Sequence, residues 1–316
     1  MAEPLIRASQ LTKRFETGGG FLAKPRSMLA VRGVSLTIER GGVLGVVGES
    51  GCGKSTLARL VLRLIEPTSG QISFDGQELT TLSRGDMRRL RRRMAMVFQD
   101  PYASLDPRFT LADVLSEPFA VQGESPPPGR IHDLLGQVGL SSAMAASYPH
   151  QLSGGQRQRA GIARALAQAP DFIVLDEPTA SLDVSIQAQI IGLLSDLRRD
   201  LGLTYMFSSH VLGLVRYFCD RIMVMYLGAV AEILPQRDAR PRHPYTQALM
   251  DSNFTPDPMK RQTLQALGGE IPSAFDLPKG CAFAGRCPYV TAQCRESMPP
   301  LAEIAPGHPV ACFHPL

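Results

Sequence analysis

The chain has 316 residues, 44% of them hydrophobic, so it is long enough for one large or two smaller domains with buried cores. Its formal net charge of +4 is too small to indicate nucleic-acid binding and fits an ordinary solvated surface. No apolar run approaches the roughly 18–20 residues of a membrane helix, and residues 1–7 lack the apolar core of a secretory signal. We therefore expect a cytosolic protein whose six cysteines form no disulfide framework.

Hydrophobic periodicity and turn residues predict an alternation of strands and helices. In the first part of the chain they predict a strand at 34–38, a turn at 41–42, a buried strand at 43–47, a helix at 56–65 that stops before Pro67, and a strand at 72–76. Farther on they predict a strand at 94–98, a helix capped by Ser153 and running to 169, a strand at 172–175, a helix at 184–199, a strand at 204–208, a helix at 211–218 and a strand pair at 221–226 and 229–233. After about residue 235 proline becomes frequent and the periodicity fades.

A glycine-rich loop separates the buried strand at 43–47 from the helix that follows. It reads Gly48-Glu49-Ser50-Gly51-Cys52-Gly53-Lys54-Ser55, followed by Thr56. Glycines let successive backbone N–H groups converge on phosphate oxygens, and the N-terminus of the next helix adds positive potential. Lys54 is expected to reach the β- and γ-phosphates, and Ser55 to ligate Mg²⁺. The strand–loop–helix order makes a chance glycine-rich turn a poor explanation, so the loop predicts ATP binding.

Two adjacent carboxylates, Asp176 and Glu177, follow the apolar strand at 172–175. Parallel α/β sheets bind their ligands at the carboxyl ends of the strands. Asp176 is expected to hold Mg²⁺, directly or through water, and Glu177 to polarise the attacking water as general base. The plainer alternative is an acidic pair that caps a helix before Pro178, and the neighbouring motifs disfavour it.

Leu152-Ser153-Gly154-Gly155-Gln156 stands between these two motifs. The order of the three motifs resembles the nucleotide-binding subunits of ATP-binding cassette (ABC) transporters, over roughly residues 5–235. The resemblance implies an α/β P-loop NTPase fold, with a RecA-like core, an antiparallel β subdomain and a helical subdomain at about residues 100–170. It also implies that residues 153–156 close over the ATP of a second subunit, with Ser153 and Gly155 at its γ-phosphate.

The same resemblance assigns roles to four further residues. Gln99 matches the glutamine that senses Mg²⁺ and the attacking water near the transporter contact, and Asp183 matches the loop that links the two sites. His210 matches the switch histidine at the γ-phosphate, although a lone histidine is more often structural. Phe15 matches the aromatic residue that stacks on adenine, although a lone aromatic in a strand is more often core. Because every expected position is filled, we expect a hydrolytically competent site.

Three stretches narrow the resemblance to the ATPases of oligopeptide and dipeptide importers: residues 97–107, 180–187 and 242–249. This resemblance implies a peripheral subunit at the cytoplasmic face of the cell (inner) membrane. Its implied partners are a second ABC ATPase, identical or a paralogue, two transmembrane permease subunits and an external solute-binding protein. Relatives in this group also import nickel or glutathione, and the ATPase sequence does not separate these substrates.

Two other classes of ABC protein compete with this interpretation. A non-transport ATPase acting on nucleic acid or ribosomes gains slight support from the six arginines within residues 84–93, but the chain has one phosphate loop and no heptad run. An exporter cassette is disfavoured by the tail and by the residues around Gln99. We expect no nucleic-acid partner.

Four of the cysteines lie in the proline-rich tail: Cys281, Cys287, Cys294 and Cys312. The intervals lack the close pairs that are typical of structural zinc sites. Four thiolates also hold iron–sulfur clusters, and some peptide-importer ATPases resemble this pattern and carry a [4Fe–4S] cluster in this region. We expect a structural [4Fe–4S] cluster, with Zn²⁺ or inert thiols as alternatives. The predicted division is therefore an ABC nucleotide-binding domain at 1–235 and a four-cysteine C-terminal domain at 236–316.

Overall fold

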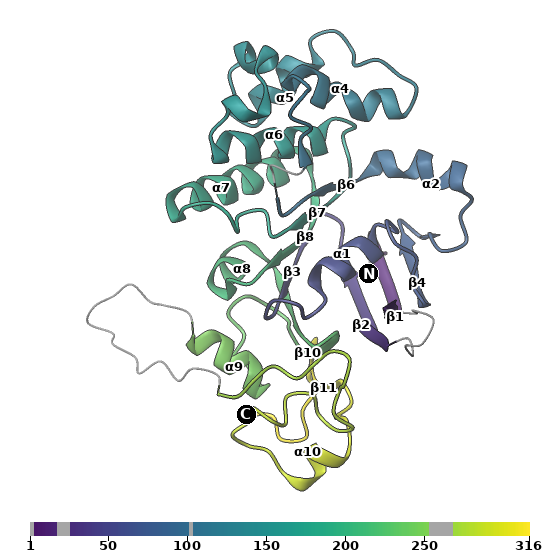
Figure 1. The fold of residues 1–316 in the computed structure, drawn as a ribbon, viewed down its shortest axis with the longest axis vertical. Helices are drawn as coiled ribbons and strands as arrows, with labels where there is room; N and C mark the ends of the chain where they lie inside the picture. Colours follow the sequence, from purple (N-terminus) through teal and green to yellow (C-terminus); the bar gives the residue numbers. More distant parts are fainter. Residues whose placement is uncertain (1–2, 18–25, 101–103, 253–267) are drawn as a thin grey trace. The chain divides into compact units, whose positions relative to one another are not determined.

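A computed structural model describes residues 3–17, 26–100, 104–252 and 268–316 (Figure 1). The chain folds into two compact units, each assembled from several segments. Unit 1 consists of residues 1–5, 38–43 and 75–207, and unit 2 of residues 6–37, 44–74 and 208–316. None of the helices within the described ranges has the length and apolarity needed to span a membrane.

Unit 1 combines a short sheet with most of the helices. The strands are ordered β8 (Thr204–Ser209, its last two residues in unit 2), β7 (Phe172–Asp176) and β6 (Met94–Val97). All five residues of β7 are buried, as expected for a strand covered on both faces. The other elements are β5 (Gln77–Glu78), α2 (Arg84–Leu90), η1 (Arg91–Arg93), α4 (Leu111–Val121), α5 (Arg130–Gln137), η2 (Ser142–Ala146), η3 (Pro149–Gln151), α6 (Gly154–Leu166) and α7 (Val184–Leu201).

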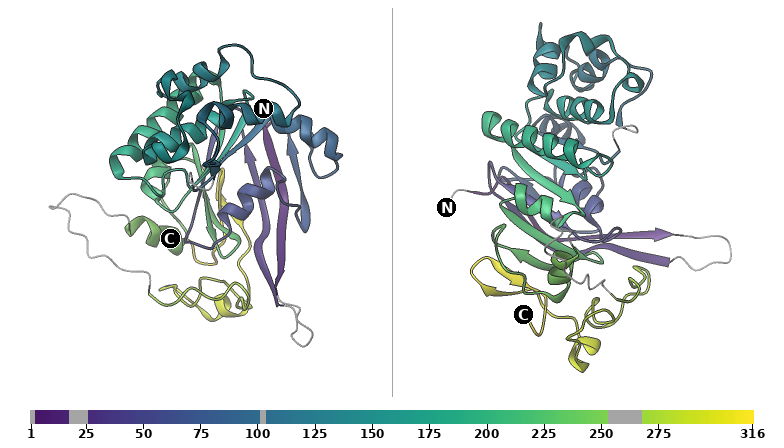
Figure 2. Two further views of the ribbon diagram at one scale, coloured as in Figure 1. Left: turned by 45° about the horizontal axis from the view of Figure 1, so that its top comes forward. Right: turned by 90° about the vertical axis from the view of Figure 1, so that its left-hand side faces the viewer.

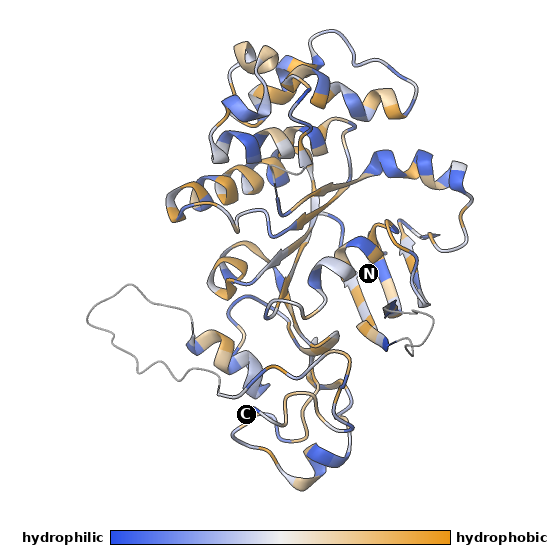
Figure 3. Ribbon diagram, in the orientation of Figure 1, coloured by the Kyte–Doolittle hydropathy of each residue, from blue (hydrophilic) through white to orange (hydrophobic). Residues whose placement is uncertain are grey.

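The arginine-rich run of unit 1 lies on α2 and η1, and Figure 3 shows α2 as an almost wholly hydrophilic helix. Arg93 pairs with Asp75 at 2.6 Å and with Asp171 at 2.5 Å, and Arg92 pairs with Glu124 at 2.6 Å. Part of this positive charge is therefore neutralised within unit 1.

Unit 2 contains two sheets. In the antiparallel one, β2 (Arg26–Ile38), β1 (Ile6–Thr17) and β4 (Ser69–Phe74) are neighbours in that order, and Figure 2 shows β1 and β2 as long adjacent strands. The second sheet has the order β11 (Ala302–Ala305), β12 (His308–Val310), β10 (Ala229–Leu234), β9 (Arg221–Tyr226) and β3 (Val43–Val47). The helices are α1 (Lys54–Val61), α8 (Leu212–Phe218), α9 (Pro244–Asp251) and α10 (Ala292–Glu296).

Strand pairing places the phosphate loop in unit 2. β3 runs parallel to β9, with Val47 opposite Val224, and the loop leaves the carboxyl end of β3. Gly45 in β3 leaves no room for a side chain, because a Cβ there would lie 2.3 Å from Val215 of α8. The close packing of α8 against β3 therefore fixes the strand that carries the loop.

Element boundaries deviate from the sequence-based prediction in one informative place. α1 ends at Val61, earlier than the predicted residue 65. Arg63 adopts a left-handed φ of 49°, and its N–H donates to the carbonyl of Leu60, so the chain turns out of the helix before Pro67. β9, by contrast, has the predicted bounds.

Candidate nucleotide-binding and hydrolysis site

The phosphate loop begins after the fully buried β3 and ends in α1. Gly53, the residue before α1, has a φ of 105°, and a Cβ there would lie 2.3 Å from the carbonyl oxygen of Ala30. Gly48 is equally constrained, since a Cβ would lie 2.3 Å from the carbonyl oxygen of Met225. Only glycine fits these positions. The first turn of α1 has no acidic residue and its N-cap makes no side-chain hydrogen bond, so its N–H groups suit an anion.

Lys54 is buried at the start of α1, with 4% of its surface exposed. Its Nζ donates to the carbonyl of Gly48 at 2.9 Å and to that of Glu49 at 3.4 Å. The ammonium group of Lys54 thus lies across the loop and binds its carbonyl oxygens. The same group is predicted to bind the phosphate oxygens of ATP.

The predicted acidic pair lies at the end of β7 in unit 1. Asp176 is the last residue of the strand and is 3% exposed. Glu177 is half-buried and has a φ of 45°, a left-handed conformation that costs about 1–3 kcal/mol for a residue with a side chain. Strain of this kind is common where a fold positions a reactive group.

Gln99 lies beside Glu177 because of the sheet register. β6 and β7 are parallel, with Val97 opposite Leu175. Gln99 and Glu177 each lie two residues farther along the chain, so they meet at the same edge of the sheet. The Nε2 of Gln99 donates to Oε2 of Glu177 at 3.3 Å. Unit 1 therefore brings together two of the three predicted catalytic residues, Gln99 and Glu177.

The segment at 153–156 forms the N-terminus of α6. The hydroxyl of Ser153 accepts from the backbone N–H of Gln156 at 3.2 Å, and Oε1 of Gln156 accepts from the N–H of Ser153 at 2.9 Å. This capping box confirms the predicted N-cap and leaves Ser153 exposed. A Cβ at Gly155 would lie 2.9 Å from Ile186, so the glycine permits close packing of α6 on α7.

Three other predicted site residues occupy ends or faces of elements. Asp183 caps α7 and accepts from the N–H of Ile186 at 2.9 Å, and this hydrogen bond lowers the pKa of its carboxyl. His210 is exposed directly after β8. Phe15 is half-buried on β1, with the ammonium of Lys13 5.2 Å from its ring centre. Their proposed roles toward ATP stay predictions.

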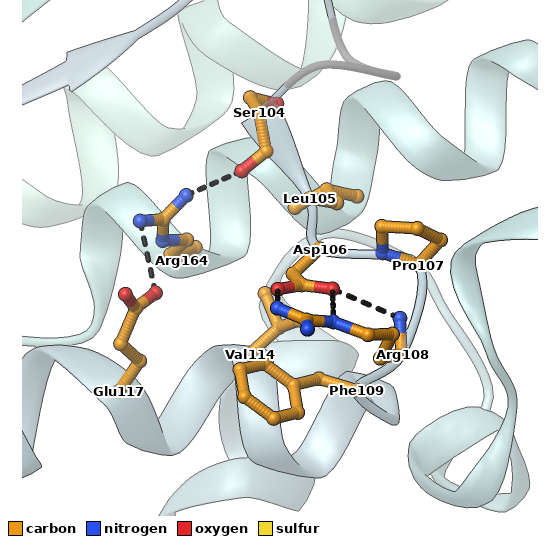
Figure 4. A pocket seen from close by; sticks show the side chains of 9 residues that line it. All are labelled: Ser104, Leu105, Asp106, Pro107, Arg108, Phe109, Val114, Glu117 and Arg164. Atoms are coloured by element: carbon orange, nitrogen blue, oxygen red, sulfur yellow. Dashed lines mark hydrogen bonds and ion pairs between the residues drawn. The ribbon is translucent and has the colours of Figure 1, made fainter.

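A cavity of about 550 Å³ lies in unit 1, shortly after Gln99 in the chain. Figure 4 shows two ion pairs among its lining residues, Arg164 with Glu117 at 2.9 Å and Arg108 with Asp106 at 2.7 Å. Hydrogen bonds from Arg108 lower the pKa of Asp106 to about 2. Arg164 belongs to α6, the helix that begins at the 153–156 segment, and also donates to the carbonyl of Ser104 at 2.7 Å. The cavity and that segment thus share one helix.

The four tail cysteines lie within unit 2 and influence one another. Burial raises the pKa values of the Cys281, Cys287 and Cys312 thiols, and neighbouring cysteines raise them further. Backbone N–H groups nearby act in the opposite direction; one, from His314, donates to Sγ of Cys312 at 3.3 Å. The donor chemistry suits a thiolate-bound metal. However, no three His, Cys, Asp or Glu side chains in the described ranges are arranged to hold a metal ion.

Two residues that contact the phosphate loop were not predicted from the sequence. Arg286 forms a two-fold ion pair with Glu49, and the hydroxyl of Tyr245 accepts from the N–H of Glu49 at 2.9 Å. They lie about 200 or more positions beyond the loop in the chain, and no local spacing signals such a contact. Glu49 itself, an acid inside an anion-binding loop, was the one available signal.

Comparison with known proteins identifies the family to which the chain belongs. Residues 31–180 match the family described as ABC transporter, and residues 228–294 match the oligopeptide/dipeptide transporter C-terminal region. The oligopeptide transport ATP-binding protein AppF of Bacillus subtilis is 46% identical, covering 98% of this chain and 97% of its own length. The protein of Brucella ovis named "Putative peptide import ATP-binding protein BOV_A0347" is 49% identical, with 98% of each chain covered.

Comparison with solved structures leads to the same family. The chain is similar to the ATP-binding cassette MJ0796, solved as a dimer in a post-hydrolysis state with ADP and phosphate, at a TM-score of 0.65 and 29% identity. The match covers 74% of this chain and all of that one. This protein therefore belongs to the ABC transporter family and has the α/β fold of its ATP-hydrolysing cassettes. Within that family it belongs with the ATPases that carry the oligopeptide/dipeptide transporter C-terminal region.

Proposed function

We propose that this chain is the ATPase subunit that energises import of di- or oligopeptides through a pair of membrane permeases. The observation that carries the proposal is the similarity to an oligopeptide transport ATPase over 98% of the chain, with the C-terminal region included. Two cassettes sandwich two ATP molecules at the cytoplasmic face of the membrane, and an external binding protein delivers the peptide. The second cassette is an identical chain or a paralogue.

Each ATP site joins groups from two chains in this proposal. One chain binds the phosphates through residues 48–56, with Lys54 at the β- and γ-phosphates and Phe15 at the adenine. The other chain contributes Ser153 to Gln156, and the exposed, capped N-terminus of α6 fits that role. Asp183 links the two sites.

Hydrolysis then depends on unit 1 groups and a histidine. Glu177 takes the proton of the attacking water as the bond between the γ-phosphorus and the β–γ bridging oxygen breaks, which releases ADP and phosphate. Gln99 orients Glu177 through their hydrogen bond, and His210 contacts the γ-phosphate. Ser55, Asp176 and Gln99 are the residues that would hold Mg²⁺, and the ion would supply positive charge that neutralises the phosphates.

The cavity lined by residues 104–109, Val114, Glu117 and Arg164 is the proposed contact for a permease. Its lining offers apolar Leu105, Val114 and Phe109 together with the two ion pairs, a mixture suited to a short amphipathic helix. Because Arg164 links this cavity to α6, a docked helix has a direct route to the segment that closes over the partner's ATP.

Reconstitution tests the import proposal. The full chain, its partner cassette, the permease pair and the binding protein are placed in vesicles, and peptide accumulation is measured together with ATP hydrolysis. Peptides are expected to stimulate hydrolysis and to accumulate, and Glu177→Gln is expected to abolish both. Stimulation by nickel or glutathione but not by peptides would overturn the peptide assignment, and co-purification with nucleic acid or ribosomes instead of permeases would place the chain outside transport.

We also propose the division of the chain into an ABC nucleotide-binding domain at 1–235 and a C-terminal domain at 236–316. A separate proposal is a [4Fe–4S] cluster held by the four tail cysteines. Its support is the presence of four cysteines in the tail and the backbone N–H of His314, which donates to Sγ of Cys312 at 3.3 Å as it would to a metal-bound thiolate. Anaerobic purification with iron and sulfide assays and an absorption spectrum tests it. A colourless protein with stoichiometric zinc, or with neither metal, contradicts it; Cys294→Ser is expected to lose the iron, and Cys219→Ser to retain it.

A further inference from the structure

Arg286 of the C-terminal extension, defined as residues 268–316, forms an ion pair with Glu49 of the phosphate loop. Arg286 Nη1 lies 2.7 Å from Glu49 Oε2, and Nη2 lies 3.0 Å from Oε1. The guanidinium side chain is 5% exposed and the carboxylate 22%. This two-fold geometry, largely removed from water, is the strong form of an ion pair.

Aromatic residues hold the arginine in place. Tyr226 accepts from Arg286 Nη1 at 3.3 Å, and the rings of Tyr226 and Phe283 have their centres 6.0 Å from the guanidinium carbon. The ring of Tyr245 packs against both of these rings, with its centre 4.7 Å from that of Tyr226 and 5.4 Å from that of Phe283. A guanidinium group enclosed by rings has little freedom to leave its partner.

Glu49 is therefore fixed at three points. Arg286 binds its carboxylate, Tyr245 accepts from its N–H at 2.9 Å, and its carbonyl accepts from Lys54 Nζ at 3.4 Å. The last contact connects the extension, through one residue, to the lysine predicted to bind the β- and γ-phosphates.

A carboxylate in a phosphate-binding loop opposes the ligand's charge. The loop attracts ATP through backbone N–H groups and the N-terminus of α1, and an unpaired Glu49 would repel the same triphosphate. Arg286 removes that repulsion and holds the loop in one conformation.

We propose that Arg286 is a positioning residue for ATP binding, so that the C-terminal extension forms part of the nucleotide site. Arg286 acts through Glu49: it neutralises the carboxylate and fixes the loop that Lys54 crosses. The inference rests on nucleotide binding by this family and is independent of the transported substrate and of the proposed iron–sulfur cluster.

The test compares Arg286→Ala, Glu49→Gln and the double variant as full-length proteins. We expect Arg286→Ala to weaken binding of a fluorescent ATP analogue, and to raise the KM for ATP, by about tenfold at low salt, with kcat changed less than about twofold. Glu49→Gln in the Arg286→Ala background is expected to recover most of the lost affinity, because the repelling charge is gone. Arg286→Lys, which keeps the charge without the fork, is expected to lie between the parent and Arg286→Ala.

Salt and a matched variant separate this role from simple destabilisation. The defect of Arg286→Ala is expected to shrink as salt is raised, since screening weakens the repulsion of ATP by Glu49. Arg295→Ala, which removes an exposed arginine of the same extension, is expected to bind ATP like the parent. A folded Arg286→Ala with parental affinity, or a double variant as weak as Arg286→Ala, overturns the proposal. Should Arg286→Ala not fold, Arg286→Lys with parental affinity at low salt overturns it equally.

Discussion

The phosphate loop and the C-terminal extension meet at Glu49, yet they are built by different rules. The loop lies between a buried strand and a helix, and most of its predicted phosphate-binding groups are backbone N–H groups placed by glycines such as Gly53. The extension has only the short elements α10, β11 and β12, and side chains hold it together: Arg286 on Glu49, and Phe283 among tyrosines. The comparison teaches that in the loop function follows from backbone geometry, whereas in the extension it depends on individual side chains.

The largest effect should come from the hydrolysis machinery, without loss of the fold. Glu177→Gln keeps the size of the side chain and its partner Gln99 but removes the proposed general base, so the ATP hydrolysis rate should fall by about 10²–10⁴. ATP binding should persist and favour a closed dimer, seen by size-exclusion chromatography with ATP. Glu296→Gln makes the same chemical change on the exposed surface of α10 and should leave hydrolysis unaffected. Near-normal turnover by Glu177→Gln would remove the general-base assignment.

This contrast also explains which features were accessible from the sequence. The phosphate loop, the cap at Ser153 and the strand that carries Asp176 follow from short-range patterns, because each depends on neighbours within one or two elements. The ABC fold was predicted differently, from the resemblance of the motif order to a known family. The Arg286–Glu49 pair joins residues 237 positions apart and leaves no periodic trace. The end of α1 was misplaced because Pro67 is an obvious breaker, whereas the left-handed Arg63 has no such signature. The cysteine intervals limited the metal chemistry but did not supply a ligand geometry.

A buried carboxylate provides the next largest expected effect, this time on stability. Glu232 of β10 is fully buried and accepts from the N–H groups of Arg242 and His243, at 2.7 and 3.0 Å, and interacts with His308 Nε2 at 2.6 Å. Glu232→Ala leaves these polar groups without their partner and should lower the free energy of unfolding by about 3 kcal/mol.

Urea unfolding measures this loss, and Glu296→Ala is the exposed control for removal of a carboxylate. A change below about 0.5 kcal/mol for Glu232→Ala would show that side chains of this kind do not hold the extension. The distinction between backbone-built and side-chain-built regions would then lose its basis.

His243 makes the same region sensitive to acid. Burial lowers its pKa from 6.5 to about 4, and its Nδ1 accepts from the N–H of Tyr245 at 3.0 Å. The unfolded chain therefore binds a proton below about pH 6.5 that the folded chain does not bind until about pH 4, so stability falls as the pH falls through this window. Between about pH 7 and pH 5 the loss should be on the order of 2 kcal/mol.

The measurement is urea unfolding of the parent and His243→Gln at both pH values. The variant should lose less stability on acidification, because a group that titrates in this window is gone. His150→Gln, which replaces an exposed histidine of η3, should keep the full pH dependence. Equal pH dependence in the parent and His243→Gln would show that other groups govern acid sensitivity.

The smallest predicted effect lies where the two regions meet. Tyr245 is fully buried, burial raises its pKa, and its hydroxyl accepts from the N–H of Glu49. Tyr245→Phe keeps the ring packing and removes one neutral hydrogen bond, which should cost about 1 kcal/mol of unfolding free energy. Tyr217→Phe, at a residue that is 73% exposed, is the matched control.

The effect of Tyr245→Phe on ATP affinity should be smaller than that of Arg286→Ala, because it introduces no uncompensated charge. If the two variants weaken ATP binding equally, the extension acts on the loop mainly by fixing its shape. If only Arg286→Ala does so, charge neutralisation at Glu49 dominates. Either result assigns the contact between the two regions to one physical cause, since Tyr245 contacts the backbone of Glu49 and Arg286 contacts its carboxylate.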